Sequence, residues 1–173
     1  ISTVRGEIDD AELGSTLMHE HVFVLGTEFQ NNYGADYWDE EVRVADAVAQ
    51  LSELAELGIK SIVDPTVLGL GRYIPRIEAV NAEVDINIVV ATGVYTYHEI
   101  PFQFHYNGPA LLFDKPEPLT ELFVRDLTVG IADTGVRAGF LKCAIEEPGL
   151  TPGVERVMRA VAQAHVRTGA PIT

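Results

Sequence analysis

Apolar residues recur along this chain with two alternating periods. Between positions 39 and 57 they fall three or four residues apart, on one face of a helix that Gly58 ends: Val42, Ala45, Val48, Ala49, Leu51, Leu54 and Leu57. A short β-rich run at 59–63 follows and ends in Asp64-Pro65-Thr66. The same patterning predicts helices over 73–84, 119–133 and 151–168, and strands over 87–92, 138–142 and 170–173.

This alternation predicts an α/β fold with a parallel sheet, either a doubly wound sheet or a (β/α)8 TIM barrel. The run 87–92 is apolar almost throughout, as expected of a parallel strand buried on both faces. Polar residues such as Asp64 and Lys142 end the predicted strands, where barrel active sites are built, and this favours the barrel. A complete barrel needs about 250 residues. We therefore expect residues 1–173 to be the N-terminal part of a single barrel domain, with four β/α units and the start of strand five.

Two segments between these elements are predicted to be loops. An acidic loop follows the segment 15–23, and a long loop at 94–118 is rich in Tyr, Phe, Pro and Gly. Long loops in compact domains usually carry function. The aromatic residues of 94–118 are therefore candidates for lining a pocket.

The segment 15–23, Ser-Thr-Leu-Met-His-Glu-His-Val-Phe, places His19 and His21 two positions apart among β-forming residues. In a strand, both imidazoles would project from the same face. Two neutral imidazoles arranged in this way can bind one divalent cation. A pair of ordinary histidines is the alternative interpretation.

Lys142 ends the predicted strand 138–142, which should be buried on both faces. A buried ammonium is costly, so the side chain reaches solvent, pairs with an acid such as Glu146 or Glu147, has a lowered pKa, or is modified. A neutral amine can take up carbon dioxide and become a carbamate. Its oxygens could then bridge two metal ions.

Composition narrows the class of partner. The chain has 26 acidic and 12 basic residues, a net charge of −14 that argues against nucleic acid and anionic membrane surfaces. A neutral or cationic small substrate fits better. The single cysteine, Cys143, cannot form an internal disulfide, and no signal peptide or membrane-spanning run is evident, so we expect a cytoplasmic enzyme.

Four motifs in this order resemble the phosphotriesterase family: Thr-Leu-Met-His-Glu-His, Ile-Val-Asp-Pro-Thr-Val-Leu-Gly-Leu-Gly-Arg, Val-Val-Ala-Thr-Gly-Val-Tyr-Thr-Tyr and Ala-Gly-Phe-Leu-Lys-Cys-Ala. The resemblance covers essentially the whole chain. It is greatest to the phosphotriesterase-like lactonases, especially the actinobacterial N-acyl-homoserine lactone hydrolases. It implies the barrel fold of the amidohydrolase superfamily.

The resemblance also implies a site. His19 and His21 match the first-strand ligands of the more buried metal, and Lys142 matches the carboxylated lysine that bridges both metals. Tyr95 and Tyr97 fall on a Tyr-x-Tyr motif near the metals. The implied cofactors are two divalent metal ions, zinc first, with cobalt, manganese or iron as alternatives. The family's other ligands, two histidines and an aspartate on later strands, have no counterpart in these 173 residues.

The activity implied is opening of the lactone ring of N-acyl-homoserine lactones (quorum quenching) by a hydroxide shared between the metals. Lys142 and Tyr95 are then the candidate catalytic residues, and Tyr95 and Tyr97 the candidate substrate-binding residues. The alternatives are a phosphotriesterase or carboxylesterase of the same family, or an inactive fragment that lacks the remaining ligands. The resemblance also allows a homodimer.

Three further residues have two interpretations each. Asp64 either orients a ligand histidine from behind or begins the turn before Pro65. Arg72 matches the family motif, but a structural ion pair accounts for it equally well. Trp38 is expected to anchor a helix rather than to contact substrate.

Overall fold

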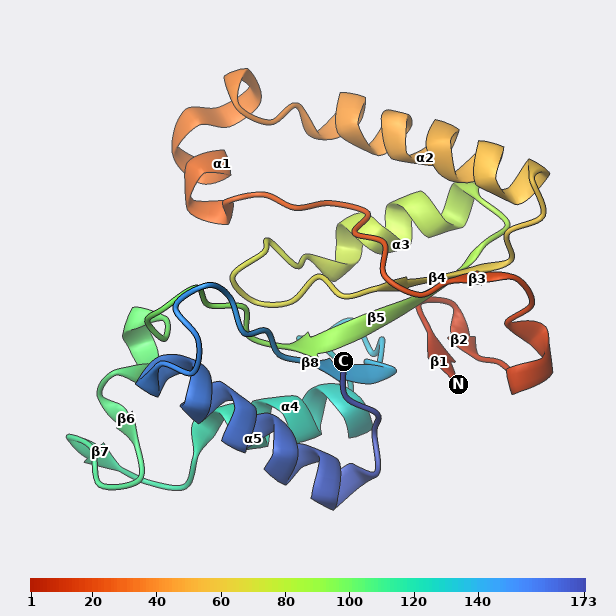
Figure 1. The fold of residues 1–173 in the computed structure, drawn as a ribbon. Helices are drawn as coiled ribbons and strands as arrows, with labels where there is room; N and C mark the ends of the chain where they lie inside the picture. Colours follow the sequence, from red (N-terminus) through yellow and green to blue (C-terminus); the bar gives the residue numbers. More distant parts are fainter.

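Four parallel strands form the central sheet, in the order in which they occur along the chain. They are β3 (Thr16–Leu17), β4 (Ser61–Asp64), β5 (Asn87–Gly93) and β8 (Phe140–Lys142). A helix follows each strand: α2 (Glu40–Glu56), α3 (Ile74–Glu83), α4 (Pro118–Thr128) and α5 (Pro152–Thr168). The computed structural model describes all residues 1–173 and confirms the predicted α/β class and parallel sheet, with four β/α units (Figure 1).

Smaller elements connect these units. Strands β1 (Ser2–Thr3) and β2 (Gly6–Glu7) form a hairpin, and β6 (Asn107–Gly108) pairs with β7 (Phe113–Asp114) inside the long loop. Single 3-10 turns occur at η1 (Asp10–Glu12), η2 (Gly34–Asp36) and η3 (Phe102–Phe104). Helix α1 (Thr27–Tyr33) lies in the segment predicted as an acidic loop, so that prediction was wrong for these residues.

Capping residues explain where the helices begin and end. The Asp39 side chain accepts a hydrogen bond from the N–H of Val42 at the start of α2, and Thr151 does the same for Val154 at the start of α5. The helix predicted over 119–133 was too long. Helix α4 ends at Thr128, and the chain turns at Gly130, whose φ of +145° favours glycine.

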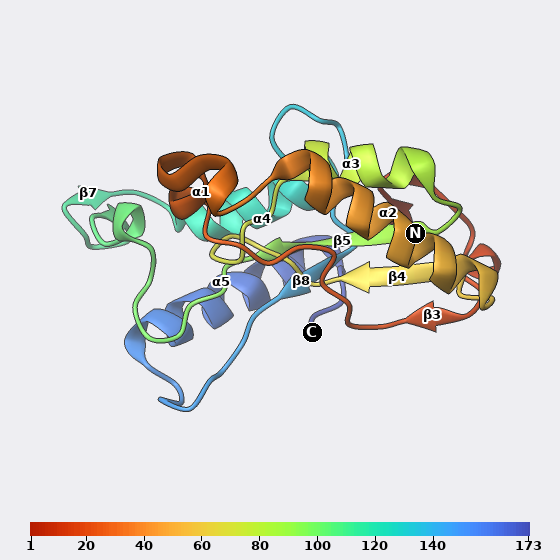
Figure 2. The same cartoon turned by 90° about the horizontal axis from the view of Figure 1, so that it is seen from above.

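The helices cover one face of the sheet and leave the other face open. Ile62 and Ile88 pack against α2 and α3, and Leu141 packs against α4 and α5, all from this one face. The strands twist relative to one another, so in Figure 1 the first pair of helices is drawn above the strands and the second pair below them. Figure 2, seen from above, shows β3, β4 and β5 side by side. The opposite face carries a small cluster of Val67, Val89, Ala91 and Phe140, beside a largely apolar hollow of about 600 Å³.

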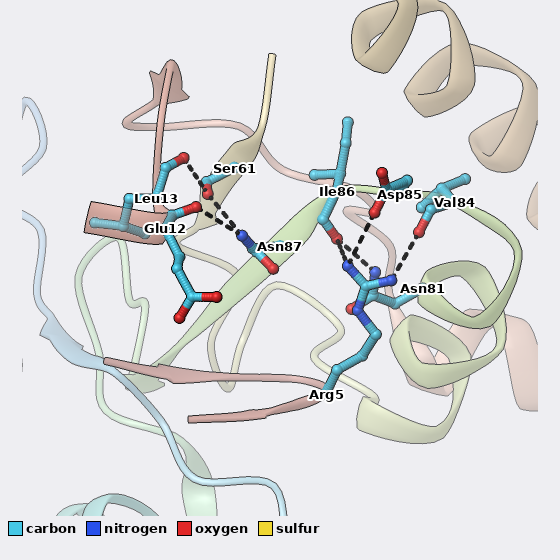
Figure 3. A network of polar contacts seen from close by, with 9 residues as sticks. All are labelled: Arg5, Glu12, Leu13, Ser61, Asn81, Val84, Asp85, Ile86 and Asn87. Carbon is cyan, nitrogen blue, oxygen red and sulfur yellow. Dashed lines mark hydrogen bonds and ion pairs between the residues drawn. The ribbon is translucent and has the colours of Figure 1, made fainter. Parts of the chain in front are cut away.

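Polar contacts close the amino-terminal end of the sheet (Figure 3). The Arg5 guanidinium donates to the carbonyls of Val84 and Ile86, at 3.1 Å each. On the neighbouring strand, the Ser61 hydroxyl donates to the Leu13 carbonyl at 2.6 Å. These groups bind one another at the end of the sheet far from Lys142, so we assign this network to stability.

The chain ends beside β8. Ile172 forms a parallel bridge with Leu141, which agrees with the predicted start of a fifth strand at 170–173. None of the helices is both long and apolar enough to cross a membrane.

Candidate metal centre

The first strand is much shorter than predicted. Only Thr16 and Leu17 pair with β4, so the strand predicted over 15–23 was wrong for most of its length. Beyond Leu17, the N–H of Glu20 donates to the Val63 carbonyl at 3.1 Å. In a regular parallel ladder His19 would make that bond, so one extra residue is inserted here, as in a β-bulge. His19 and His21 therefore follow the strand rather than alternate within it.

The two imidazoles are nevertheless neighbours. Their ring centroids lie 5.4 Å apart, edge to face, with His19 exposed and the side chain of His21 26% exposed. Burial lowers the pKa of His21, and the positive charges of His19 and Lys142 lower it further, against a smaller opposing effect of Glu20. His21 is therefore neutral at pH 7, the form in which an imidazole binds a metal.

Thr66 and Asp64, at the end of β4, lie on the Nδ1 side of the His21 ring. Its Nδ1 lies 2.8 Å from the Thr66 hydroxyl, and that hydroxyl lies 2.5 Å from Oδ1 of Asp64. The Thr66 N–H also donates to Asp64 Oδ1, at 2.9 Å. Asp64 itself is 3.8 Å from His21 Nδ1, too far for a direct hydrogen bond. The structure thus combines both interpretations of Asp64, because it forms the turn at Thr66 and reaches His21 through it.

Asp64 is only 2% exposed, and burial raises its pKa to about 6, although hydrogen bonds from Thr66 and Val22 act in the opposite direction. No arginine or lysine pairs with it. Asp64 is thus a buried acid whose hydrogen bonds offset only part of the cost of burying its charge.

Lys142 is the last residue of β8 and is half-buried. Its charge acts on His21, so β8 and the segment after β3 bring the two side chains to the same end of the sheet. Gly93 allows this arrangement, because a Cβ there would collide with the backbone carbonyl of Lys142. Lys142 forms no ion pair, so the alternative in which Glu146 or Glu147 neutralises it does not hold.

Those two acids instead accept hydrogen bonds from the candidate substrate-binding residues. Tyr95 donates to Glu146 at 3.3 Å, and Tyr97 donates to Glu147 at 3.0 Å. Burial and then Glu146 raise the pKa of Tyr95, whereas the hydrogen bond to Glu147 is the main cause that raises the pKa of Tyr97. Both phenols therefore keep their protons at neutral pH and remain donors.

Arg76 holds in place the chain segment that follows the histidines. Its guanidinium lies over the rings of Phe23, Trp38 and Tyr73, 5.1–5.6 Å from their centroids, and its Nε donates to Glu40 at 2.6 Å. Phe23 is two residues from His21, so this cluster fixes the path of the chain beyond the histidines. Trp38 packs at the start of α2, as expected of a helix anchor.

Arg72 has a structural role. Its Nη1 is 2.9 Å from Asp126 and donates to the Ala91 carbonyl at 3.0 Å, while the Thr92 hydroxyl donates to the same carboxylate at 2.7 Å. All of these groups are buried or nearly so. Of the two interpretations of Arg72, the structure supports the ion pair.

The residues gathered here fit part of a metal centre. Two adjacent imidazoles, one of them held neutral, are suitable ligands, and Lys142 is free of any protein partner. An ammonium cannot bind a cation, so Lys142 fits this role only as a carbamate. No third histidine, cysteine, aspartate or glutamate joins the pair.

Three residues at the site were not predicted from the sequence, and the role of one segment was overestimated. Thr66 was visible only as part of Asp64-Pro65-Thr66, and Glu146 and Glu147 were considered only as partners of Lys142. The aromatic residues of the long loop were expected to line a pocket. Phe102, Phe113 and Tyr106 are instead exposed.

Comparisons with known proteins identify the family of the chain. Residues 1–173 match the sequence profile described as the phosphotriesterase family. A phosphotriesterase homology protein from Mycobacterium tuberculosis is 62% identical over 173 residues, 100% of this chain and 53% of that protein. An aryldialkylphosphatase from Saccharolobus solfataricus is 39% identical over 169 residues, 97% of this chain and 51% of that protein.

A solved structure gives the same result. The structure of the phosphotriesterase from Mycobacterium tuberculosis superposes with a TM-score of 0.96 at 63% identity, and the match covers 99% of this chain and 53% of that one. The chain spans about half the length of the relatives it matches. The family resemblance is confirmed, whereas these matches do not single out the acyl-homoserine lactone hydrolases within it. The chain belongs to the phosphotriesterase family.

Proposed function

We propose that this chain is part of a metal-dependent hydrolase that opens the lactone ring of N-acyl-homoserine lactones. The observation that carries the proposal is the gathering of His19, His21 and Lys142 at the carboxyl ends of β3 and β8, with Lys142 unpaired. Unpaired groups of this kind at a barrel's active end are typical of a ligand set rather than of a stabilising network.

His19, His21 and carboxylated Lys142 would hold two divalent cations, with zinc as the first expectation. When bound, such cations lower the pKa of a shared water and polarise the carbonyl of the substrate. The remaining ligands would come from later strands of a closed eight-stranded barrel. The consecutive parallel order of the four strands and the open apolar face support that architecture.

The phenols and acids beside this site favour a neutral substrate. Tyr95 keeps its proton and can donate it to an oxygen of the lactone, which would orient the ring. Glu146 and Glu147 place negative charge beside both tyrosines and would repel anionic esters. Ring opening converts a neutral lactone into a carboxylate, and the same repulsion would favour release of that product.

Hydrolysis of phosphotriesters is the second candidate function. The relative that is 39% identical is named an aryldialkylphosphatase, and a phosphotriester is also a neutral substrate that yields an anion. A long-chain N-acyl-homoserine lactone and an aryl dialkyl phosphate, assayed side by side, distinguish the two. We expect the higher kcat/KM for the lactone. A higher value for the phosphate would assign the main activity to the second candidate.

The metal requirement is tested by a chelator and by Lys142→Ala. We expect chelation to abolish hydrolysis and added Zn²⁺, Co²⁺ or Mn²⁺ to restore it, and we expect the variant to lose bound metal. Lys115→Ala, which removes an exposed lysine, is the matched control and should retain metal. Activity that survives chelation, or unchanged metal content in Lys142→Ala, would refute the proposed centre.

A further inference from the structure

A buried hydrogen-bonded chain runs from Asp64 through Thr66 to the back of His21. Thr66 is 6% exposed and Asp64 2% exposed, so solvent has little access to either group. The Thr66 Oγ1 has three neighbours: Asp64 Oδ1 at 2.5 Å, His21 Nδ1 at 2.8 Å and the Phe23 carbonyl at 3.3 Å. A hydroxyl carries one proton, and this limit decides how the chain is arranged.

While Asp64 is ionised, the proton count leaves one arrangement in which every close contact is a hydrogen bond. An ionised carboxylate and a carbonyl can only accept, so the Thr66 proton goes to Asp64, the nearer of the two. If the proton went to His21 instead, the hydroxyl oxygen and the carboxylate would face each other at 2.5 Å with no proton between them. His21 Nδ1 must therefore donate to Thr66.

We propose that Thr66, its hydroxyl oriented by Asp64, is a positioning residue that holds His21 with its proton on Nδ1 and leaves Nε2 free to bind a divalent cation. This role rests on the proposed function, because it assigns His21 as a ligand. The carboxylate acts through the threonine, since Asp64 is 3.8 Å from the ring nitrogen. Ligand histidines typically donate their other N–H to such a partner, which fixes the tautomer and the ring orientation.

Local backbone geometry makes Thr66 suitable for this role. Its own N–H donates to Asp64 Oδ1 at 2.9 Å, which closes a tight turn and fixes the Cα. A β-branched side chain has few χ1 choices, so the hydroxyl is held where His21 meets it. Serine can make the same bonds but lacks the methyl group.

The experiment compares three variants of the protein as isolated. Thr66→Val removes the hydroxyl and keeps the shape, and Thr66→Ser restores the hydroxyl. Thr92→Val is the matched control, because it removes another buried threonine hydroxyl that donates to an aspartate, at 2.7 Å, but touches no histidine. Affinity for Co²⁺ is measured by competition with a chelating dye, and circular dichroism checks that each variant folds.

We expect Thr66→Val to bind Co²⁺ about 10- to 100-fold more weakly. Thr66→Ser and Thr92→Val should stay near the wild-type affinity. Wild-type affinity in Thr66→Val would overturn the proposal, as would an equal loss in Thr92→Val. If Thr66→Val fails to fold, a similarly large loss in folded Thr66→Ser would also overturn it.

A second readout separates this inference from the proposed function. Nitrogen-15 NMR of the metal-free protein reports which ring nitrogen of His21 carries the proton, with His21→Asn used to assign the signals. The measurement is made at pH 8, where Asp64 is ionised. A proton on Nδ1 there supports the chain of bonds, and a proton on Nε2 overturns it. If the wild type binds no divalent metal, the proposed function fails, while this measurement still decides the role of Thr66.

Discussion

Two buried threonine–aspartate pairs lie at the carboxyl ends of neighbouring strands, and they differ in what completes them. At β5, Thr92 and Asp126 are joined by Arg72, whose guanidinium is 2.9 Å from the carboxylate. At β4, Thr66 and Asp64 face His21 and have no cationic partner of fixed charge. The same hydroxyl–carboxylate unit is therefore a closed ion pair in one place and an open hydrogen-bonded chain in the other.

The difference teaches where to look for function in a sheet of this kind. A buried carboxylate paired with arginine has its charge balanced, and it ties the loop before α3 to α4. A buried carboxylate without such a cation remains costly even when it is hydrogen-bonded, and a costly group of this kind is a candidate for a functional role. For Asp64, the role that we propose is to position His21 through Thr66.

Breaking the closed pair should have the largest effect on stability. Arg72→Met leaves Asp126 buried without its cation, and we expect the free energy of unfolding to fall by about 3–5 kcal/mol. Urea denaturation measures it. The double variant Arg72→Met/Asp126→Leu should lose much less, because no unpaired charge remains. An equal loss in both would show that packing, rather than charge pairing, carries the effect.

Removing the charge of the open pair should have the opposite effect and raise the free energy of unfolding. The pKa of Asp64 is about 6 in the folded protein and 3.8 in the unfolded chain, so the folded state holds the proton more tightly and stability falls as pH rises from about 4 to 6. Above pH 6 the full penalty, about 3 kcal/mol, is present. Asp64→Asn should therefore stabilise protein stripped of divalent metal at pH 8, with the gain vanishing near pH 4. A gain that is independent of pH would contradict this account.

An exposed ion pair should have the smallest effect. Arg159 and Glu155 are one helical turn apart on α5, with side chains 74% and 43% exposed. We expect Arg159→Ala to lower the free energy of unfolding by about 0.3–0.5 kcal/mol, and less at high salt. A loss as large as that of Arg72→Met would mean that burial does not distinguish the two pairs.

Several expectations from the sequence remain predictions. They are the homodimer, a cytoplasmic location, and the absence of nucleic-acid and membrane partners. The assignment of residues 1–173 to one barrel domain is of the same kind. The catalytic and metal-binding roles of His19, His21, Lys142, Tyr95 and Tyr97 also await the experiments above.

Local patterning predicted most of the fold. The helix predicted over 39–57 is α2 at Glu40–Glu56, and the strand predicted over 87–92 is β5 at Asn87–Gly93. Both elements have long, regular periods that packing reinforces. The strand predicted over 15–23 is wrong beyond Leu17. Its apolar residues fit a strand, but the extra residue before Glu20 is set by the pairing with β4, which the local pattern does not contain. Register of this kind is a long-range property.

The candidate site, like the fold, could be predicted only in part from the sequence. The sequence by itself determined which chemical groups are present and their order, with His19 and His21 close together and Lys142 at the end of an apolar run. Only the tertiary structure decided that Lys142 has no acidic partner, that Glu146 and Glu147 bind tyrosines, and that Thr66 stands between Asp64 and His21. The physical reason is that hydrogen-bond partners are chosen by distances of a few tenths of an ångström between residues 45 to 51 positions apart. Chain packing sets those distances, and local sequence patterns do not.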